Sequence, residues 1–355
     1  MPAHNLIHGG DVYTAMENGL ERPLDFSAYI GPMGLPPAVA EAARKAVGSC
    51  DAYPDPLCRR LTAALAGRLG VEPARVFVGN GSDEVIDLLF RVRAVPGVHN
   101  AVAFRPCFGL YVTQARLAGV ELRRARLAED FSFDFDSLLE RVDANTTLVF
   151  VTSPDNPSGR LAPVRDLIRV ARALPPACLL VVDEAYIDFA GEEHSLLKHL
   201  DEVPNVALLR TFSKVYGLAG LRVGYGILPP RLADYMWRVR LPFSVNVLAE
   251  QALEDDIFRE ITRRVVAEGR TVLSDGLRAL GCTVLPSHAN FLMFAPPVGG
   301  PDARVLHQTL LERGIIVRAL GGYHLPDWLR VSVGMEEENR LFLAECADIL
   351  RGGRV

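Results

Sequence analysis

The residues with the clearest chemical potential lie in one short stretch, Val206–Gly226. An apolar run of strand type leads into Thr211, Ser213 and Lys214, and Arg222 follows one short loop later. The amine of such a lysine can condense with an aldehyde, while the hydroxyls and the guanidinium bind a phosphate on the same molecule. An isolated lysine after a strand is more often simply exposed. The neighbouring residues favour a site for a phosphorylated aldehyde.

A second candidate segment, Gly79–Glu84, places glycines directly before a predicted helix. Free backbone N–H groups and the dipole at the start of a helix attract phosphate. We therefore expect Gly81, Ser82 and Asp83 to bind the same phosphate as the lysine stretch, with Ser82 or Asp83 capping the helix. The segment is not the dinucleotide-binding G-x-G-x-x-G motif, because Glu84 stands where its last glycine would be.

A common sheet must position these segments. Short apolar runs of strand type alternate with helical patterns through the first two thirds of the chain. The strands are expected at 76–78, 101–104, 147–152, 178–183 and 206–209, and the helices between them at 82–92, 109–117, 163–174 and 195–200. This alternation predicts an α/β fold with a mostly parallel sheet and helices on both faces. Because sites in such sheets lie at the carboxyl ends of the strands, we expect Asp183 near the lysine.

The flanking segments predict a second, smaller unit. Helices are expected at 38–47 and 58–69 before the sheet, and at 229–239, 244–255 and about 257–280 after it. Strands near 283–285, 291–294, 315–317 and 330–333 indicate a smaller α+β domain. We expect a large domain over residues 46–245, and a small domain formed by residues 1–45 together with 246–355.

Composition narrows the classes of function. The 355 residues are 49% hydrophobic and 23% charged, and the net charge of −5 gives no reason to expect nucleic acid or an anionic membrane as a partner. No apolar run approaches the ~18 residues of a membrane span, and the N-terminus lacks the pattern of a secretion signal. The six cysteines include no C-x-x-C pair, which favours reduced thiols in the cytoplasm over disulfides or a metal site.

The lysine stretch resembles that of class I/II aminotransferases of fold type I, which use pyridoxal 5′-phosphate (PLP). The resemblance extends from His8 to about Ile349, and within the family it is closest to histidinol-phosphate aminotransferase and L-threonine-O-3-phosphate decarboxylase. The segments that carry it are Phe212–Gly220, Asp183–Tyr186, Ser153–Gly159, Pro106–Phe108 and Tyr53–Pro56. It implies the fold type I architecture for the predicted sheet.

The resemblance assigns roles around the cofactor. Lys214 would hold PLP and move a proton during the reaction. Asp183 would keep the ring nitrogen protonated, so that the ring withdraws electrons. Tyr186 and Asn156 would reach the phenolic oxygen of the ring.

Two further aromatic positions follow from the same resemblance. Phe108 matches the residue that stacks on the ring, and Tyr111 is the other candidate for this flat apolar wall. Tyr53 resembles a tyrosine that family members lend to the cofactor phosphate of the other subunit. This implies a homodimer in which two chains share each site.

Arginines near the C-terminus are the expected anion grip. Arg330 begins one predicted strand and Arg318 ends another, and in the family these positions hold the anionic part of the substrate. A guanidinium binds carboxylate and phosphate alike, so charge by itself does not identify the substrate. Tyr13, Tyr29 and Asn246 complete the set of substrate-binding candidates.

The segment Ser27–Pro32 departs from both relatives. The aminotransferases usually carry N-x-N-E-N-P there and the decarboxylases S-A-N-I-N-P, whereas this chain reads S-A-Y-I-G-P. His8–Gly10 and Phe243–Asn246 resemble the decarboxylase, while Phe212–Gly220 and Leu329–Gly334 resemble the aminotransferase. The substrate therefore stays open between histidinol phosphate, threonine phosphate and another small anionic amine.

Together these features predict a PLP-dependent aminotransferase of the histidinol-phosphate aminotransferase type. It would move an amino group between a small anionic amine or amino acid and 2-oxoglutarate. The alternative is decarboxylation of L-threonine-O-3-phosphate, since PLP weakens whichever Cα bond stands perpendicular to its ring. A third possibility is a regulatory module that binds the cofactor without catalysis. Such a module would need an appended DNA-binding segment, and none is recognisable in the sequence.

Overall fold

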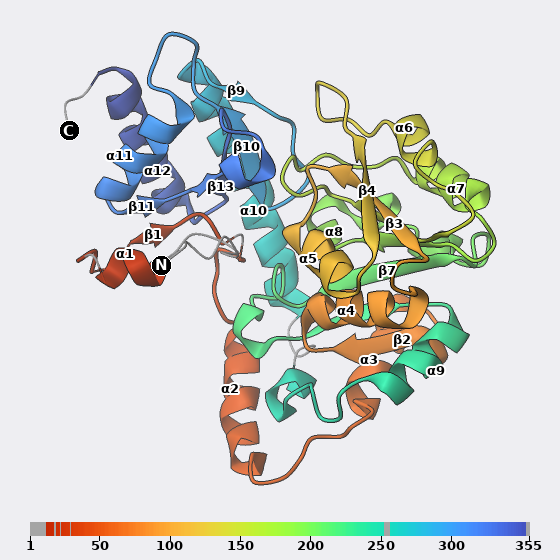
Figure 1. Cartoon of the computed structure of the whole chain (residues 1–355). Coiled ribbons are helices and arrows are strands. Elements are labelled where there is room, and N and C mark those ends of the chain that lie inside the picture. The colour runs from red at the N-terminus through yellow and green to blue at the C-terminus, as the bar shows by residue number, and fades with distance from the viewer. Residues whose placement is uncertain (1–11, 18, 22, 29, 252–255, 353–355) are drawn as a thin grey trace.

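A seven-stranded sheet flanked by helices forms the larger lobe of the computed structural model, which describes residues 12–17, 19–21, 23–28, 30–251 and 256–352 (Figure 1). The strand order is β2-β8-β7-β6-β5-β3-β4. Only β8 runs antiparallel to its neighbours in this sheet, so the expected mostly parallel sheet is confirmed. The strands are β2 (Val76–Gly79), β3 (Asn100–Arg105), β4 (Glu121–Arg126), β5 (Thr146–Thr152), β6 (Leu179–Asp183), β7 (Val206–Thr211) and β8 (Gly224–Ile227).

Helices cover both faces of this sheet, as the α/β pattern predicts. On one face the buried side chains of α4 (Gly81–Arg93), α5 (Gly109–Leu117) and α9 (Pro230–Val239) pack against the strands. On the other face α3 (Arg59–Leu69), α6 (Phe135–Leu139) and α7 (Val164–Ala173) do so. The central strands are buried on both sides, which explains their continuous apolar sequences.

The second lobe combines the two ends of the chain (Figure 1). Its antiparallel sheet has the order β12-β13-β10-β9, with strands Arg318–Ala319, Leu329–Ser332, Phe291–Ala295 and Thr283–Val284. The N-terminal β1 (Leu24–Asp25) pairs in parallel with β11 (Ile315–Ile316). The helices of this lobe are α10 (Asp256–Ala279), α11 (Ala303–Glu312) and α12 (Glu336–Leu350), while α1 (Val12–Glu17) and α2 (Pro37–Ala46) belong to the N-terminal segment. None of the helices in the described ranges is long and apolar enough to cross a membrane.

The carboxyl ends of β5, β6 and β7 meet at one edge of the large sheet. The backbone N–H of Ser153 donates to the carbonyl of Asp183 (2.9 Å), and the N–H of Glu184 donates to the carbonyl of Leu209 (2.8 Å). These bonds join the three strands where the polar candidate residues begin. Asp183 and the lysine segment therefore lie at the carboxyl ends of neighbouring strands, as expected.

Two expected helices and one expected cap are wrong. Residues 195–200 contain only a 3₁₀ turn, Leu197–His199, because the Ser195 side chain accepts the N–H of Leu197 and competes with helical bonding. Residues 244–255 contain the 3₁₀ helix Val247–Gln251, with 252–255 outside the described residues. The cap of α4 is Asn80, and not Ser82 or Asp83, because the left-handed Gly81 already belongs to the helix.

Candidate active site

A cavity of about 380 Å³ lies at the carboxyl ends of β5, β6 and β7. It is lined by every residue expected at the cofactor except Tyr53, namely Gly81, Ser82, Asp83, Phe108, Asn156, Asp183, Tyr186, Thr211, Ser213, Lys214 and Arg222. The other lining residues are Ala28, Ile30, Leu110, Thr152, Ala185 and Ala219. The structure thus brings together six segments of the chain, around residues 28 and 30, 81–83, 108–110, 152–156, 183–186 and 211–222.

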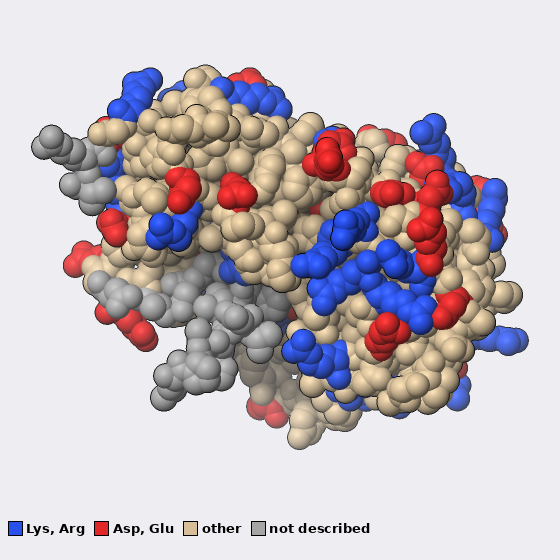
Figure 2. Space-filling view, turned by 45° about the horizontal axis from the view of Figure 1, so that its top comes forward, with Lys and Arg blue, Asp and Glu red and all other residues tan. Residues whose placement is uncertain are grey.

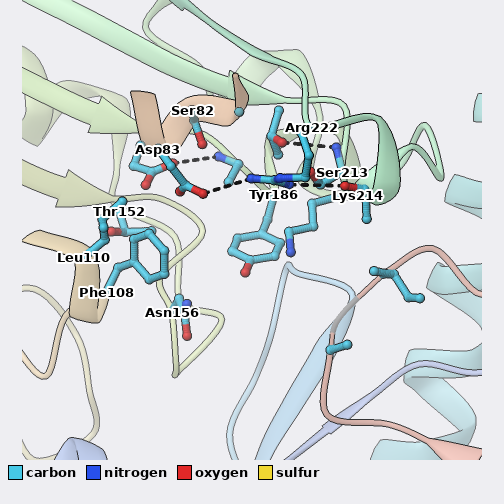
Figure 3. Close-up of a pocket in the computed structure, with 17 residues that line it drawn as sticks. Ser82, Asp83, Phe108, Leu110, Thr152, Asn156, Tyr186, Ser213, Lys214 and Arg222 are labelled. Atoms are coloured by element: carbon cyan, nitrogen blue, oxygen red, sulfur yellow. Dashed lines mark hydrogen bonds and ion pairs between the residues drawn. The ribbon is translucent and has the colours of Figure 1, made fainter. Parts of the chain in front are cut away.

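The lining residues form two facing walls and one polar end (Figure 3). Figure 3 shows Phe108 on one side of the space, with Tyr186 and Lys214 opposite it. Ser82, Asp83, Ser213 and Arg222 gather at one end of the space. A flat molecule with an anionic group at one end fits between these walls.

Lys214 lies in the loop that follows β7, close to Tyr186. Its Nζ is 5.5 Å from the centre of the Tyr186 ring. Burial, together with the positive charge of Arg330, lowers the pKa of Lys214 to about 7. A neutral amine is the nucleophilic form, so this environment prepares Lys214 to attack a carbonyl near neutral pH.

Asp183 ends β6 and is buried. Its Oδ2 accepts the hydroxyl proton of Tyr111 (2.7 Å), and its Oδ1 accepts the N–H of Ala185 (3.2 Å). Burial raises the pKa of Asp183 to about 6, while the Tyr111 hydrogen bond opposes that rise. The carboxylate is thus held in a fixed orientation at the base of the cavity.

The two candidate stacking residues have different positions. Phe108 lines the cavity, whereas Tyr111 is fully buried and stacks on Phe150 with ring centres 4.6 Å apart. The Tyr111 hydroxyl is 2.9 Å from Thr152 Oγ1, in addition to its bond with Asp183. Tyr111 therefore supports Asp183 from behind and does not form the wall of the cavity.

Two glycines allow close packing at the end of the cavity where Ser82, Asp83, Ser213 and Arg222 lie. Gly81 has a φ of +75°, and a Cβ added there would lie 2.8 Å from Arg222 Nη2. A Cβ on Gly224, in β8, would lie 2.3 Å from the backbone nitrogen of Ser82. The first N–H groups of α4, which have no partner within the helix, therefore lie beside the loop after β7. Arg222 Nη2 is 3.1 Å from Asp83 Oδ2 across this end.

Arg330 approaches the cavity from the small sheet. It is buried, its Nη1 donates to Asn156 Oδ1, and its guanidinium lies 4.9 Å from the centre of the Phe291 ring. Arg318 is its direct cross-strand partner in the β12–β13 pair. Opposite residues of an antiparallel pair share a face, so two guanidinium-bearing side chains lie on one face of this sheet.

Three expected residues lie away from the cavity, and a fourth is not among the described residues. Tyr53 is 82% exposed and stacks on Phe243 (4.5 Å between ring centres), and Tyr13 is also 82% exposed. Asn246 is engaged in a turn, because its amide donates to the Leu221 carbonyl (2.7 Å) and its oxygen accepts backbone N–H groups. Tyr29 lies outside the described residues.

A buried ion pair, which no local sequence pattern marks, joins the strand ends behind the site. Arg210, the neighbour of Thr211, contacts Glu184, the neighbour of Asp183, at 2.8 Å. The Ser195 hydroxyl donates to Glu184 (2.7 Å), and Arg210 also binds the exposed Glu192 (2.7 Å). Removing one partner of such a pair leaves a buried charge uncompensated, so the pair fixes β6 and β7 relative to each other.

Comparison with known proteins gives a consistent result. The family model "Aminotransferase class I and II" matches residues 22–345. A histidinol-phosphate aminotransferase from Nitratidesulfovibrio vulgaris (strain DP4) is 56% identical over 338 residues, covering 94% of this chain and 90% of that protein. One from Oleidesulfovibrio alaskensis is 52% identical over 341 residues, covering 94% and 89%. The crystal structure of histidinol-phosphate aminotransferase from Sinorhizobium meliloti in complex with pyridoxal-5′-phosphate superimposes with a TM-score of 0.89 at 29% identity, covering 98% of this chain and 95% of that one.

Proposed function

The chain belongs to the class I and II aminotransferase family and is a PLP-dependent transaminase, and from this premise we propose that its amino donor is histidinol phosphate and its acceptor 2-oxoglutarate. The observation that carries the choice of donor is the 56% identity, over 94% of the chain, to a relative of that name. The expected cofactor and reaction class are thereby confirmed. The donor and the roles of individual residues are what we propose.

The residues in the cavity fit PLP. The glycine-walled end offers the N–H groups of α4, the hydroxyls of Ser82 and Ser213 and the guanidinium of Arg222 to a phosphate. Phe108 provides a flat wall, and the buried Asp183 provides a carboxylate for the ring nitrogen. When bound, PLP withdraws electrons from the Cα of the substrate.

The residues of this chain then have distinct tasks. Lys214 would hold the cofactor through its Nζ, and the same atom would act as the base that takes a proton from the substrate and returns it. Its lowered pKa of about 7 suits this exchange, since a base works best near the pH of its surroundings. Asp183, which Tyr111 orients, would keep a proton on the ring nitrogen of the cofactor.

The paired arginines support an anionic substrate. Arg318 and Arg330 lie directly opposite each other in the β12–β13 pair, so both guanidinium groups leave the same face of the small sheet. A phosphate or a carboxylate bound between them would interact with both guanidinium groups, which would orient the substrate. The same grip serves histidinol phosphate in one half of the reaction and 2-oxoglutarate in the other.

The second candidate is decarboxylation of L-threonine-O-3-phosphate. Its support is the segment Ala28–Gly31, where Ala28 and Ile30 line the cavity and offer no polar side chain to an imidazole. At Gly31 a Cβ would lie 2.9 Å from the Lys214 carbonyl oxygen, so the asparagine that both relatives carry here would not fit without movement. Threonine phosphate has no imidazole and would therefore need no polar partner from this wall.

A product assay on a substrate panel tests the donor. Histidinol phosphate, threonine phosphate and several acidic or aromatic amino acids are each supplied with 2-oxoglutarate, and both glutamate and carbon dioxide are measured. We expect glutamate to form fastest from histidinol phosphate, with no carbon dioxide. Carbon dioxide from threonine phosphate, without glutamate from any donor, would overturn the proposal.

We further propose that the protein acts as a cytoplasmic homodimer in which Tyr53 reaches the partner's site. In its own chain Tyr53 lies outside the cavity, and with Phe243, Leu57 and Leu241 it presents exposed apolar side chains. All six cysteines are free thiols, in keeping with a reducing compartment. We also propose that residues 46–245 form the cofactor-binding domain, and residues 1–45 with 246–355 the smaller one.

A further inference from the structure

Three arginines share one face at the edge of the large sheet. Arg105 ends β3, and Arg124 and Arg126 belong to the edge strand β4. In the register of the two strands Arg105 pairs with Arg126, and Arg124 pairs with Ala103. Since every second residue of a strand faces the same side, and neighbouring strands lie about 4.8 Å apart, the three side chains leave the sheet together. All three are exposed.

These arginines differ from their neighbours in having no acidic partner among the residues that the structure describes. Arg123, which points to the opposite face, binds Glu121 (3.0 Å) and Asp143 (2.6 Å). Other exposed arginines, such as Arg44, Arg91 and Arg238, bind an acidic residue of their own helix. Figure 2 shows that Lys and Arg side chains gather on the lobe that carries the large sheet. The positive charge of the three is therefore available to molecules in solution.

Two of the three arginines are connected to a segment that leads into the active-site cavity. From Arg105 the chain continues through Pro106 and Cys107 to Phe108, which lines the cavity. Three residues of extended chain span at most about 11 Å. Burial raises the pKa of Cys107 to about 12, and the charge of Arg124 opposes that rise, which places Arg124 close to the same segment.

We propose that Arg105, Arg124 and Arg126 form an approach surface that attracts anionic substrates to the cavity. This inference rests on the proposed function in one respect, since it takes both the amino donor and the acceptor to be anions. The chain as a whole carries a net charge of −5, which repels anions. A local group of three uncompensated cations beside the entrance reverses that repulsion where the substrates enter.

The size of the effect follows from the charges and their distance. For three unit charges about 12 Å from an approaching monoanion in water, at an ionic strength of about 10 mM, the expected gain in association rate is about threefold. For a dianion it is about tenfold under the same conditions. At about 0.15 M, where the screening length falls to about 8 Å, the gain shrinks to about twofold or less.

The test uses the PLP-loaded enzyme and two probes that do not depend on the natural donor. Aminooxyacetate, an anion, and O-methylhydroxylamine, which is neutral, both react with the carbonyl carbon of the bound cofactor. Their second-order rates are followed by absorbance at 10 and 150 mM ionic strength. The variant is R105Q/R124Q/R126Q. The matched control is R231Q/R304Q/R351Q, which removes the same charge from exposed arginines on other elements.

We expect the first variant to slow aminooxyacetate about threefold at 10 mM and less than twofold at 150 mM. O-methylhydroxylamine should react at an unchanged rate, which also shows that the cavity is intact. The control variant should leave both rates nearly unchanged. An unchanged rate with aminooxyacetate, an equal loss with both probes, or an equal loss in the control would overturn the inference. A different natural donor would leave all of these rates as they are, so failure of the proposed function would be seen separately.

Discussion

Replacing Gly224 by alanine should disturb the phosphate end of the cavity without removing any group expected to bind there. Gly224 lies in β8, opposite Thr211 on one side and Gly79 on the other. The new Cβ would lie 2.3 Å from the nitrogen of Ser82, and 3.0 Å from the carbonyl oxygen of Arg210. Both are backbone atoms, so no flexible side chain can move aside to make room.

The displacement sets the expected magnitude. Ordinary contact begins at 3.4 Å, so the start of α4 and β8 must separate by about 1.1 Å, the difference between 3.4 and 2.3 Å. A misplacement of about 1 Å can lower a catalytic rate about 100-fold, and we take the same factor for an anion that must be bound from two elements at once. We therefore expect the affinity for PLP to fall about 100-fold, equivalent to about 2.7 kcal/mol.

The assay is an equilibrium titration of cofactor-free protein with PLP, followed by absorbance. Gly220→Ala is the matched control, because Gly220 is exposed and a Cβ there would have no atom within 4 Å. It should bind PLP within about twofold of the unchanged protein. A folded Gly224→Ala protein that binds PLP within threefold of the unchanged one would refute the reasoning, as would an equal loss in the control.

Three further changes give separate predictions. Lys214→Ala should lower turnover by at least about 10³-fold, because no other lysine lines the cavity in the described part of the chain. Stopped-flow measurement of turnover with saturating donor checks this. A loss of less than about tenfold would count against a catalytic role for Lys214. Tyr111→Phe removes the O–H that stabilises ionised Asp183. The pKa of Asp183 in the folded protein, about 6, already exceeds the ~3.9 of an unfolded chain, and it should rise further in the variant. Because the folded-state pKa is the higher one, the variant loses more of its free energy of unfolding as the pH increases through that pKa. Urea unfolding of the cofactor-free variant should show a loss about 1 kcal/mol larger at pH 8 than at pH 4, and an equal loss at both would contradict this role. Mixing an inactive Tyr53 variant with the inactive Lys214 variant should restore activity in hybrid dimers, and no recovery after verified subunit exchange would exclude a shared site.

The large sheet could be predicted because its central strands are buried on both faces. That burial makes β5, β6 and β7 read as continuous apolar runs, each followed by polar residues at the strand end. Two strands gave no such signal. β4 is an edge strand with the sequence ELRRAR, whose charged side chains reach water. β8 reads GYGI, where glycine serves the close approach to α4 and weakens the strand pattern.

Eleven of the residues that line the cavity could be named from the sequence, because each lies in a short motif that resembles the family's. What the motifs could not give are contacts made by tertiary packing. Tyr111 was a candidate wall of the cavity, and only the packing of α5 on β6 turns its hydroxyl toward Asp183. The pairing of Arg210 with Glu184 joins residues 26 apart in the sequence, and no local pattern marks it. Arg318 and Arg330 were named separately, and only the register of β12 and β13 brings them together.

The central claim is that Lys214 and the glycine-walled end of the cavity hold PLP. It is tested most directly by reducing the purified, yellow protein with borohydride, digesting it, and locating the pyridoxyl group by mass spectrometry. We predict one modified site, at Lys214, since its lowered pKa of about 7 leaves the amine ready to bind the cofactor. A pyridoxyl group on any other lysine, or none at all on a protein saturated with PLP, would contradict the account.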